Sequence, residues 1–189
     1  MKTYVITLSK VFPKAHSRAG QETGFRSKFL KAINIEDVNS EDMFFFNKNN
    51  VYKLHTIRRN YELWAKRFRE ISEGRAILSV RQWTGKPYQS KQTIIAELGK
   101  NEGIGIERLD FPLHRLTSPA INFNPYLSTD WEMAHNDGLD YDDWLNWFKG
   151  YDLTKTMVII HFTKFRYGRL EHLRDNICGI PNQSIFSEG

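Results

Sequence analysis

Hydrophobic positions along the chain follow two periods, one typical of strands and one typical of helices. Alternation of apolar and polar residues predicts strands over 4–8 and 75–83, and the apolar run over 157–162 predicts another. Further strands are expected over 51–57, 92–98 and 103–109. Apolar residues three and four positions apart predict helices over 25–35, 60–72, 129–136 and 141–149. Helices and strands do not alternate regularly. We therefore expect an α+β domain with a mixed, largely antiparallel sheet, of a kind that can close into a small barrel with short helices beside it.

Polar residues mark the ends of several predicted helices. Asn60 is placed to cap the helix that ends at Ser72, and Gly74 suits the position after its end. Thr129 and Glu132 have the spacing of a capping box, which predicts a helix start there. The residues expected to face the core from the helix over 60–72 are Leu63, Trp64, Phe68 and Ile71.

The length of 189 residues suits one domain. We expect that domain to cover residues 1–163, with insertions at 36–50 and 111–127 and a loosely held extension over 164–189. The first insertion carries the cluster Met43-Phe44-Phe45-Phe46, which would tuck onto the core. No apolar run approaches the roughly 18 residues of a membrane span, and the first residues do not form a signal-peptide core. We expect a cytoplasmic protein without membrane association.

Charge is unevenly divided along the chain, although the net charge is only +5. Residues 1–100 carry 19 Lys and Arg against 9 Asp and Glu, and the remainder carries 8 against 13. A basic and an acidic half can face each other across a cleft, the first attracting phosphate and the second supplying a carboxylate. A solvated surface with an accidental split explains the same numbers.

The segment Lys53-Leu54-His55-Thr56-Ile57-Arg58 brings an amine, a hydroxyl and a guanidinium close together in the sequence. A Lys in a partly desolvated cleft has a lowered pKa and can take a proton from a hydroxyl, here that of Thr56. Arg58 offers a planar fork for a phosphate or a base carbonyl. Lys53 and Thr56 converge only if the strand ends or bulges near Lys53. Judged by its chemistry alone, the segment is more simply explained as a basic edge strand.

This segment resembles a family signature. Lys53-x-x-Thr56-x-Arg58 is similar to the Lys-x-x-Thr-x-Arg motif of the ASCH domain, a member of the PUA-like superfamily. The later segment 134–144 resembles the family too, since a short helix with an acidic residue leads into a second helix and a final strand. The resemblance covers roughly residues 51–162 and the first strand. It implies a PUA-like β-barrel with a cleft beside the motif, in a family associated with RNA binding.

Some small bacterial members that this chain resembles are amidohydrolases that remove the acyl group from N4-acetylcytidine. The resemblance implies that Lys53 and Thr56 match their Lys and Thr, and that Asp137 stands where they have a Glu. Thr56 would then attack the amide carbonyl while Lys53 assists and Asp137 passes a proton to the leaving amine.

A second segment of interest runs from residue 81 to residue 91. Its cations and aromatic residues are Arg81, Trp83, Lys86, Tyr88 and Lys91. Cations hold phosphates and exposed aromatic rings stack on bases, so the segment suits a nucleic-acid interface. Equally, the two aromatic residues can pin the loop to the core.

Three functions remain open at this point. The leading hypothesis is a module with a basic cleft that binds RNA or a modified nucleoside, and the second is an amidohydrolase acting on N4-acylated cytidines. The third is a protein-interaction module whose aromatic insertion docks a partner. We expect no cofactor and no metal, because the six His residues show no tight metal spacing and the single Cys178 cannot form a thiolate cage. The oligomeric state is left open.

Overall fold

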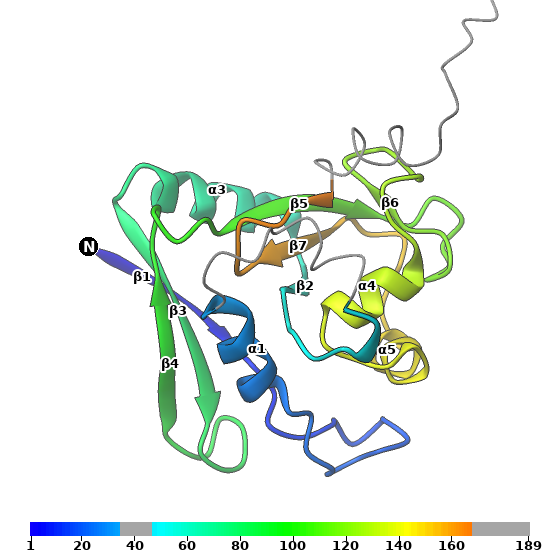
Figure 1. The fold of residues 1–189 in the computed structure, drawn as a ribbon, viewed down its shortest axis with the longest axis horizontal. Coiled ribbons are helices and arrows are strands. Elements are labelled where there is room, and N and C mark those ends of the chain that lie inside the picture. The colour runs from blue at the N-terminus through cyan, green and yellow to red at the C-terminus, as the bar shows by residue number, and fades with distance from the viewer. Residues whose placement is uncertain (35–46, 168–189) are drawn as a thin grey trace, which may run out of the picture.

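The computed structural model describes residues 1–34 and 47–167, which form two β-sheets and four α-helices (Figure 1). The strands are β1 (Lys2–Thr7), β2 (His55–Arg59), β3 (Ala76–Trp83), β4 (Gln92–Leu98), β5 (Gly105–Asp110), β6 (Ala120–Ile121) and β7 (Met157–His161). The helices are α1 (Phe25–Ile33), α3 (Tyr61–Ser72), α4 (Asp130–Asn136) and α5 (Tyr141–Phe148), with a short 3-10 helix η1 (Asn47–Asn49). The predicted α+β class is confirmed.

Hydrogen bonding divides the strands between a three-stranded sheet, β1-β3-β4, and a four-stranded sheet, β2-β7-β5-β6. Among the strands of the described residues only β1 and β3 run parallel, so the expected mixed and largely antiparallel pairing is confirmed. In the second sheet Thr56 pairs with Ile160, and that pairing places β2 beside the buried central strand β7. Among the described residues, no helix has the length and apolar character needed to cross a membrane.

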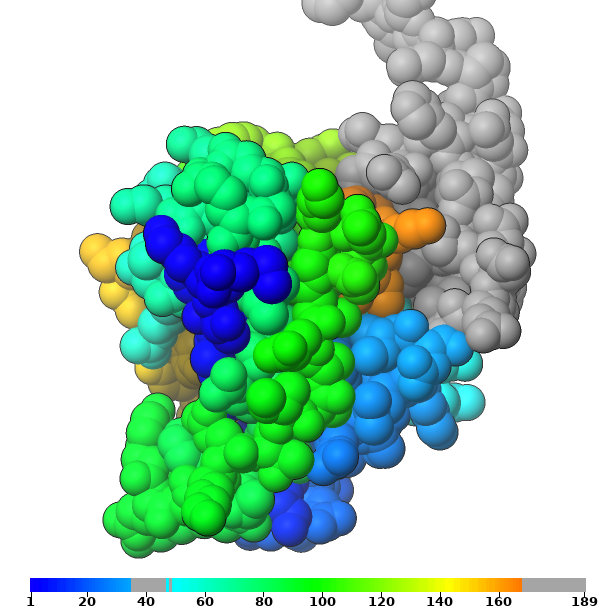
Figure 2. All heavy atoms as spheres, turned by 90° about the vertical axis from the view of Figure 1, so that its left-hand side faces the viewer, coloured from blue at the N-terminus to red at the C-terminus, as the bar shows by residue number. Residues whose placement is uncertain are grey.

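Helix α3 follows its predicted ends closely. The Asn60 side chain accepts a hydrogen bond from the Leu63 N–H, and Gly74 has a φ of 73°. The prediction that Leu63 is buried is wrong, because 41% of this residue is exposed. Glu70 is buried instead. Beside α3 in the side view lies the dark blue β1 (Figure 2). From this strand Lys2 Nζ forms an ion pair with the Glu70 carboxylate at 2.9 Å, and Tyr4 Oη donates to the same carboxylate at 2.6 Å.

Two segments near the end of the described chain differ from expectation. The insertion at 111–127 contains β6, which pairs with β5 and so is not wholly irregular. Residues 165 and 167 were expected in a loosely held tail, yet Phe165 and Tyr167 are buried in the core. That expectation is wrong for this part of the extension because both rings pack on His161 of β7. The cluster Met43–Phe46 and Cys178 lie outside the described residues.

The second strand begins four residues later than predicted, and this shift decides where Lys53 lies. The predicted strand starts at residue 51, but β2 starts at His55. The Lys53 N–H donates to the Lys28 carbonyl and the Leu54 N–H donates to the Asn136 carbonyl, so the Lys53 amide is held by α1, while the Leu54 carbonyl still accepts from the Phe162 N–H just after β7. Lys53 is therefore free of the strand's alternation.

Candidate functional site

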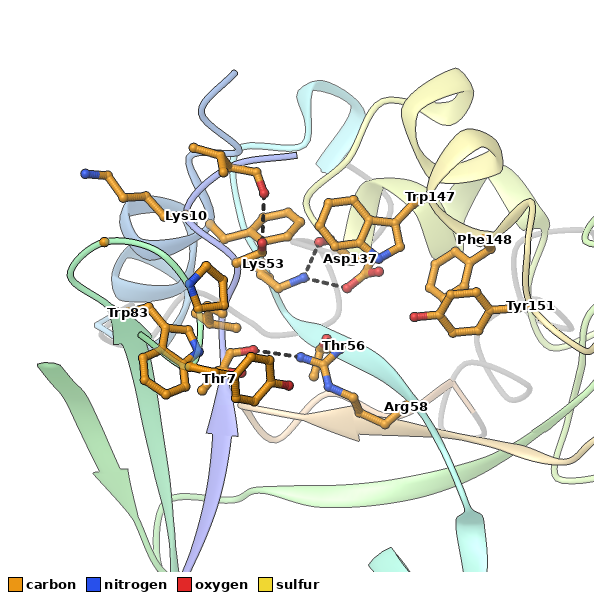
Figure 3. Close-up of a pocket in the computed structure, with 17 residues that line it drawn as sticks. Thr7, Lys10, Lys53, Thr56, Arg58, Trp83, Asp137, Trp147, Phe148 and Tyr151 are labelled. Atoms are coloured by element: carbon orange, nitrogen blue, oxygen red, sulfur yellow. Dashed lines mark hydrogen bonds and ion pairs between the residues drawn. The ribbon is translucent and has the colours of Figure 1, made fainter. Parts of the chain in front are cut away.

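A pocket of about 390 Å³ lies where the two sheets meet helices α1 and α5 (Figure 3). Its wall is formed by residues 7–11 after β1, the start of α1, the segment around Lys53, and Thr56 and Arg58 of β2. The remainder comes from the end of β3, the β3–β4 loop, Asp137 and residues 147, 148 and 151. Segments far apart in the sequence thus supply one concave surface of the size that small ligands occupy.

Lys53 and Asp137 form a buried ion pair in the wall of this pocket. The Lys53 Nζ donates to Asp137 Oδ1 at 2.5 Å and to the Asp137 main-chain carbonyl at 2.6 Å. The amine also sits 3.9 Å from the centre of the Phe25 ring, an arrangement that suits a cation. Figure 3 shows the two side chains facing each other above Thr56 and Arg58. The predicted amine and carboxylate are therefore brought together.

The chain around Asp137 makes this close approach possible. Asp137 is the C-cap residue directly after α4, and its N–H still donates to the Met133 carbonyl. Gly138 follows in the left-handed region with a φ of 79°. A Cβ at position 138 would lie 3.2 Å from the Lys53 Cβ, so glycine suits both the backbone angle and the space.

Burial shifts the pKa of both partners toward their neutral forms. Removal from water lowers the pKa of Lys53 to about 8, although the Asp137 carboxylate acts in the opposite direction. Burial likewise raises the pKa of Asp137, against the attraction of Lys53 and Arg58. With a pKa of about 8, roughly a tenth of the Lys53 amines are unprotonated at pH 7. A minority of the Lys53 amines is therefore available to accept a proton near neutral pH.

Thr56 and Arg58 form a second polar pair on the other side of the pocket. Arg58 Nη1 donates to Thr56 Oγ1 at 2.7 Å, and Nη2 donates to the Thr7 carbonyl at 3.0 Å. These bonds hold the guanidinium in place and leave the Thr56 hydroxyl with its own proton to donate. Among the described residues, Lys53 and Asp137 thus form one hydrogen-bonded pair, and Thr56 is paired with Arg58, so the three predicted catalytic side chains share one pocket without forming a connected triad.

Aromatic side chains stand on two sides of these polar groups. Trp83 and Tyr88 come from the β3 end and the following loop, with ring centres 5.4 Å apart. Trp147, Phe148 and Tyr151 lie on the opposite side in Figure 3. Tyr88 is 91% exposed, so its ring is at the mouth of the pocket, whereas Trp83 is half-buried. Tyr88 is therefore accessible to a ligand, and Trp83 is accessible only in part.

Three predicted cations do not line the pocket. The Arg81 Nε folds back along β3 and donates to Ser79 Oγ at 2.8 Å. Lys86 and Lys91 are exposed on the β3–β4 loop. Local sequence placed them near the aromatic residues, but a solvent-exposed loop lets long side chains point outward. Of the predicted cations, Lys53 and Arg58 lie in the pocket wall.

Sequence reasoning missed several pocket residues. Lys10 contributes a further cation from the loop after β1, and its only sequence signal was the basic character of that loop. Phe25 and Trp147 belong to helices whose apolar spacing predicted only a core role. Tyr151 follows a helix end and had no local signal.

His55 lies on the face of β2 opposite to Thr56 and belongs to a separate buried polar cluster. His55 Nε2 is 2.8 Å from Tyr167 Oη, and His161 Nε2 is 2.9 Å from Glu107 Oε2. The Tyr167 hydroxyl accepts a further bond from Asn136 Nδ2 at 3.2 Å. Burial lowers the pKa of both imidazoles, although the Glu107 carboxylate acts in the opposite direction on His161. This cluster fixes the residues behind the pocket and does not line it.

Within residues 1–34 and 47–167, no group of three or more His, Cys, Asp or Glu side chains could hold a metal ion. The polar groups of the pocket are an amine, a carboxylate, a hydroxyl and a guanidinium, which suit organic hydrogen-bonding partners better than a metal. Comparisons with known protein families, with curated proteins and with solved structures found no match.

Proposed function

We propose that the pocket binds a nucleoside, either free or as one unpaired residue of an RNA strand. The observation that carries this proposal is the position of the Lys53–Asp137 and Thr56–Arg58 pairs between aromatic walls in a pocket of about 390 Å³. Aromatic rings stack on a base whatever its identity, and polar groups at its edge select it. A pocket of this size suits one base with its ribose and excludes a duplex.

The polar groups offer both hydrogen-bond donors and hydrogen-bond acceptors to the edge of a base. Arg58 keeps N–H groups beyond those used by Thr56 and the Thr7 carbonyl, and these can donate to a base carbonyl. Asp137 has a second carboxylate oxygen that can accept from an exocyclic amine. A pyrimidine with a carbonyl beside an amine, such as cytosine or an N4-modified derivative, matches this pattern.

The same arrangement supports a place for this chain in the ASCH family, with a PUA-like barrel as its architecture. The residues of the Lys-x-x-Thr-x-Arg motif, Lys53, Thr56 and Arg58, line one pocket together with Asp137. Tyr88 at the pocket mouth, with Lys86 and Lys91 exposed on the same loop, gives a surface for the neighbouring residues of a strand.

Binding of free nucleosides tests the proposal. Cytidine and N4-acetylcytidine are titrated into wild-type protein by calorimetry, with Arg58→Lys as the pocket variant and Arg59→Lys as its control. Arg58→Lys keeps the charge but loses the planar fork, so we expect the affinity to fall about tenfold or more. Arg59 is the next residue and does not line this pocket, although its guanidinium lies 4.4 Å from the centre of the Tyr151 ring. A lysine there keeps a cation for that ring, so the control variant should bind as the wild type does.

The outcomes separate the possible ligands. If neither a nucleoside nor a short single-stranded RNA binds, the proposed function is rejected. Binding of RNA with a strong dependence on salt, and of nucleosides without one, indicates that a strand is the natural ligand, because salt dependence reports phosphate contacts.

A second candidate function is hydrolysis of an N4-acyl group, and the Lys53–Asp137 pair favours it. A lysine with a pKa of about 8 can act as a base near neutral pH, and its partner carboxylate can take the proton onward. The Arg58 cation beside the Thr56 hydroxyl would stabilise an oxygen that gains negative charge.

In this reaction the Thr56 Oγ attacks the acyl carbon and Lys53 takes the hydroxyl proton. The carbon–nitrogen bond then breaks, and the proton passes by way of Asp137 to the leaving amine of the base. This leaves an ester between Thr56 and the acyl group. Water hydrolyses the ester to the carboxylic acid and restores the Thr56 hydroxyl.

Turnover of N4-acetylcytidine, followed as release of cytidine and acetate, tests this candidate. We expect Thr56→Val to abolish turnover while keeping the shape of the side chain, and Thr56→Ser to retain part of it. Nucleoside binding without turnover at any pH between 6 and 10 would reject hydrolysis and leave the binding function standing.

A further inference from the structure

Lys28 of α1 contacts both chain segments that carry the buried ion pair. Its main-chain carbonyl accepts a hydrogen bond from the Lys53 N–H at 3.2 Å. Its ammonium donates to the Gly138 carbonyl at 2.7 Å, directly after Asp137, and to Asn50 Oδ1 at 3.0 Å. One residue thus links the Lys53 segment to the turn that follows α4.

The contact is close and specific. Gly138 leaves so little room that a Cβ there would lie 3.4 Å from the Lys28 Cδ. Asn50, the second partner of Lys28, also donates to the Asp140 carboxylate at 2.5 Å, so the ammonium is held from both sides of the turn. Lys28 is half-buried and is absent from the pocket wall, so it would not touch a bound ligand.

We propose that Lys28 is a positioning residue, which holds the turn after α4 against α1 and so keeps Asp137 within hydrogen-bonding distance of Lys53. This inference rests on the proposed function only in taking Lys53 and Asp137 as the working groups of the pocket. A helix side chain that fixes a carbonyl next to a reacting group restricts that group's movement, which a site of this kind requires.

The charges that face Lys53 allow positioning to be told apart from a simple charge effect. They are the Asp137 carboxylate, which raises the pKa of Lys53, and the Arg58 and Lys28 cations, which lower it. Loss of the Lys28 charge by itself would therefore raise the pKa of Lys53. Loss of the Asp137 contact would lower it, because the amine would stay buried with a weaker partner.

The test is the pKa of Lys53 in ligand-free protein, followed through its side-chain nitrogen chemical shift in lysine-labelled protein and assigned with Lys53→Met. In Lys28→Met we expect this pKa to fall from about 8 by about one unit. Lys31→Met, an exposed lysine of the same helix, is the matched control and should leave it unchanged. Lys28→Arg, which restores a donor, should recover part of the fall.

A rise in the pKa of Lys53, or no change, in folded Lys28→Met would overturn the proposal. Should that variant not fold, Asn50→Gly removes one partner of the ammonium and suits the positive φ of this residue. It is expected to give a smaller fall, and an unchanged pKa there also counts against the proposal. Since the titration needs no ligand, a failure to bind nucleosides would leave its result standing.

Discussion

Removing both charges of the buried pair is expected to stabilise the protein while abolishing its function. In Lys53→Met/Asp137→Asn the side chains keep nearly the same shape, and neither carries a charge. Burial lowers the pKa of Lys53 from 10.5 to about 8, and at about 1.4 kcal/mol per unit this costs the folded state about 3 kcal/mol at neutral pH. The double variant also loses the hydrogen bond from Lys53 to the Asp137 carbonyl, and this loss offsets about 1 kcal/mol of the gain in stability.

The double variant should therefore be more stable than the wild type by about 1 to 2 kcal/mol at pH 7, within the range seen when buried ion pairs are replaced by neutral residues. The single variant Asp137→Asn leaves the amine buried without its carboxylate. Lys53 must then lose its proton, which from 10.5 to pH 7 costs up to about 5 kcal/mol, so this variant should be less stable than the double variant.

Urea unfolding of the wild type and both variants, measured between pH 7 and pH 10.5, checks the order of their stabilities. It also checks the direction in which the differences change with pH. The folded pKa of Lys53 lies below its unfolded value, so the unfolded chain binds more protons between about 8 and 10.5. The contribution of Lys53 to wild-type stability therefore rises with pH through this window. The difference in free energy of unfolding between the double variant and the wild type should therefore become smaller toward pH 10.5. A double variant no more stable than Asp137→Asn, or a difference that does not change with pH, would refute the reasoning.

Three further predictions concern single residues. Asn60→Ala should lower the free energy of unfolding by about 1 to 2 kcal/mol in urea because it removes a helix cap, whereas Asn60→Gly, which tolerates the positive φ, should cost less. Gly138→Ala should lower the melting temperature and weaken nucleoside binding, because its Cβ would crowd Lys53; unchanged binding would show that Lys53 tolerates displacement. Tyr88→Ala should leave stability within about 0.5 kcal/mol of wild type but weaken binding of single-stranded RNA, measured by fluorescence anisotropy.

The sequence alone determined those features whose cause is local. The strand over 92–98 has the predicted bounds, since its β-branched residues favour an extended chain and Gly99 follows its end. The capping box of Thr129 and Glu132 is present for the same reason, because a helix start is satisfied by side chains three residues apart. The residues Lys53, Thr56, Arg58 and Asp137 could be named from the resemblance, without any knowledge of their spacing.

Tertiary structure decided how those residues meet. The hydrogen bonds that hold Lys53 off the strand come from α1 and α4, from residues that lie 25 and 82 positions away from the Lys53 and Leu54 amides that they fix. Alternation within 51–57 could not reveal them, because partners so distant contribute nothing to a local pattern. The same holds for Lys10 and Trp147, which reach the pocket only after the chain has folded. Local periodicity reports which face a side chain takes, whereas the pocket depends on which faces pack together.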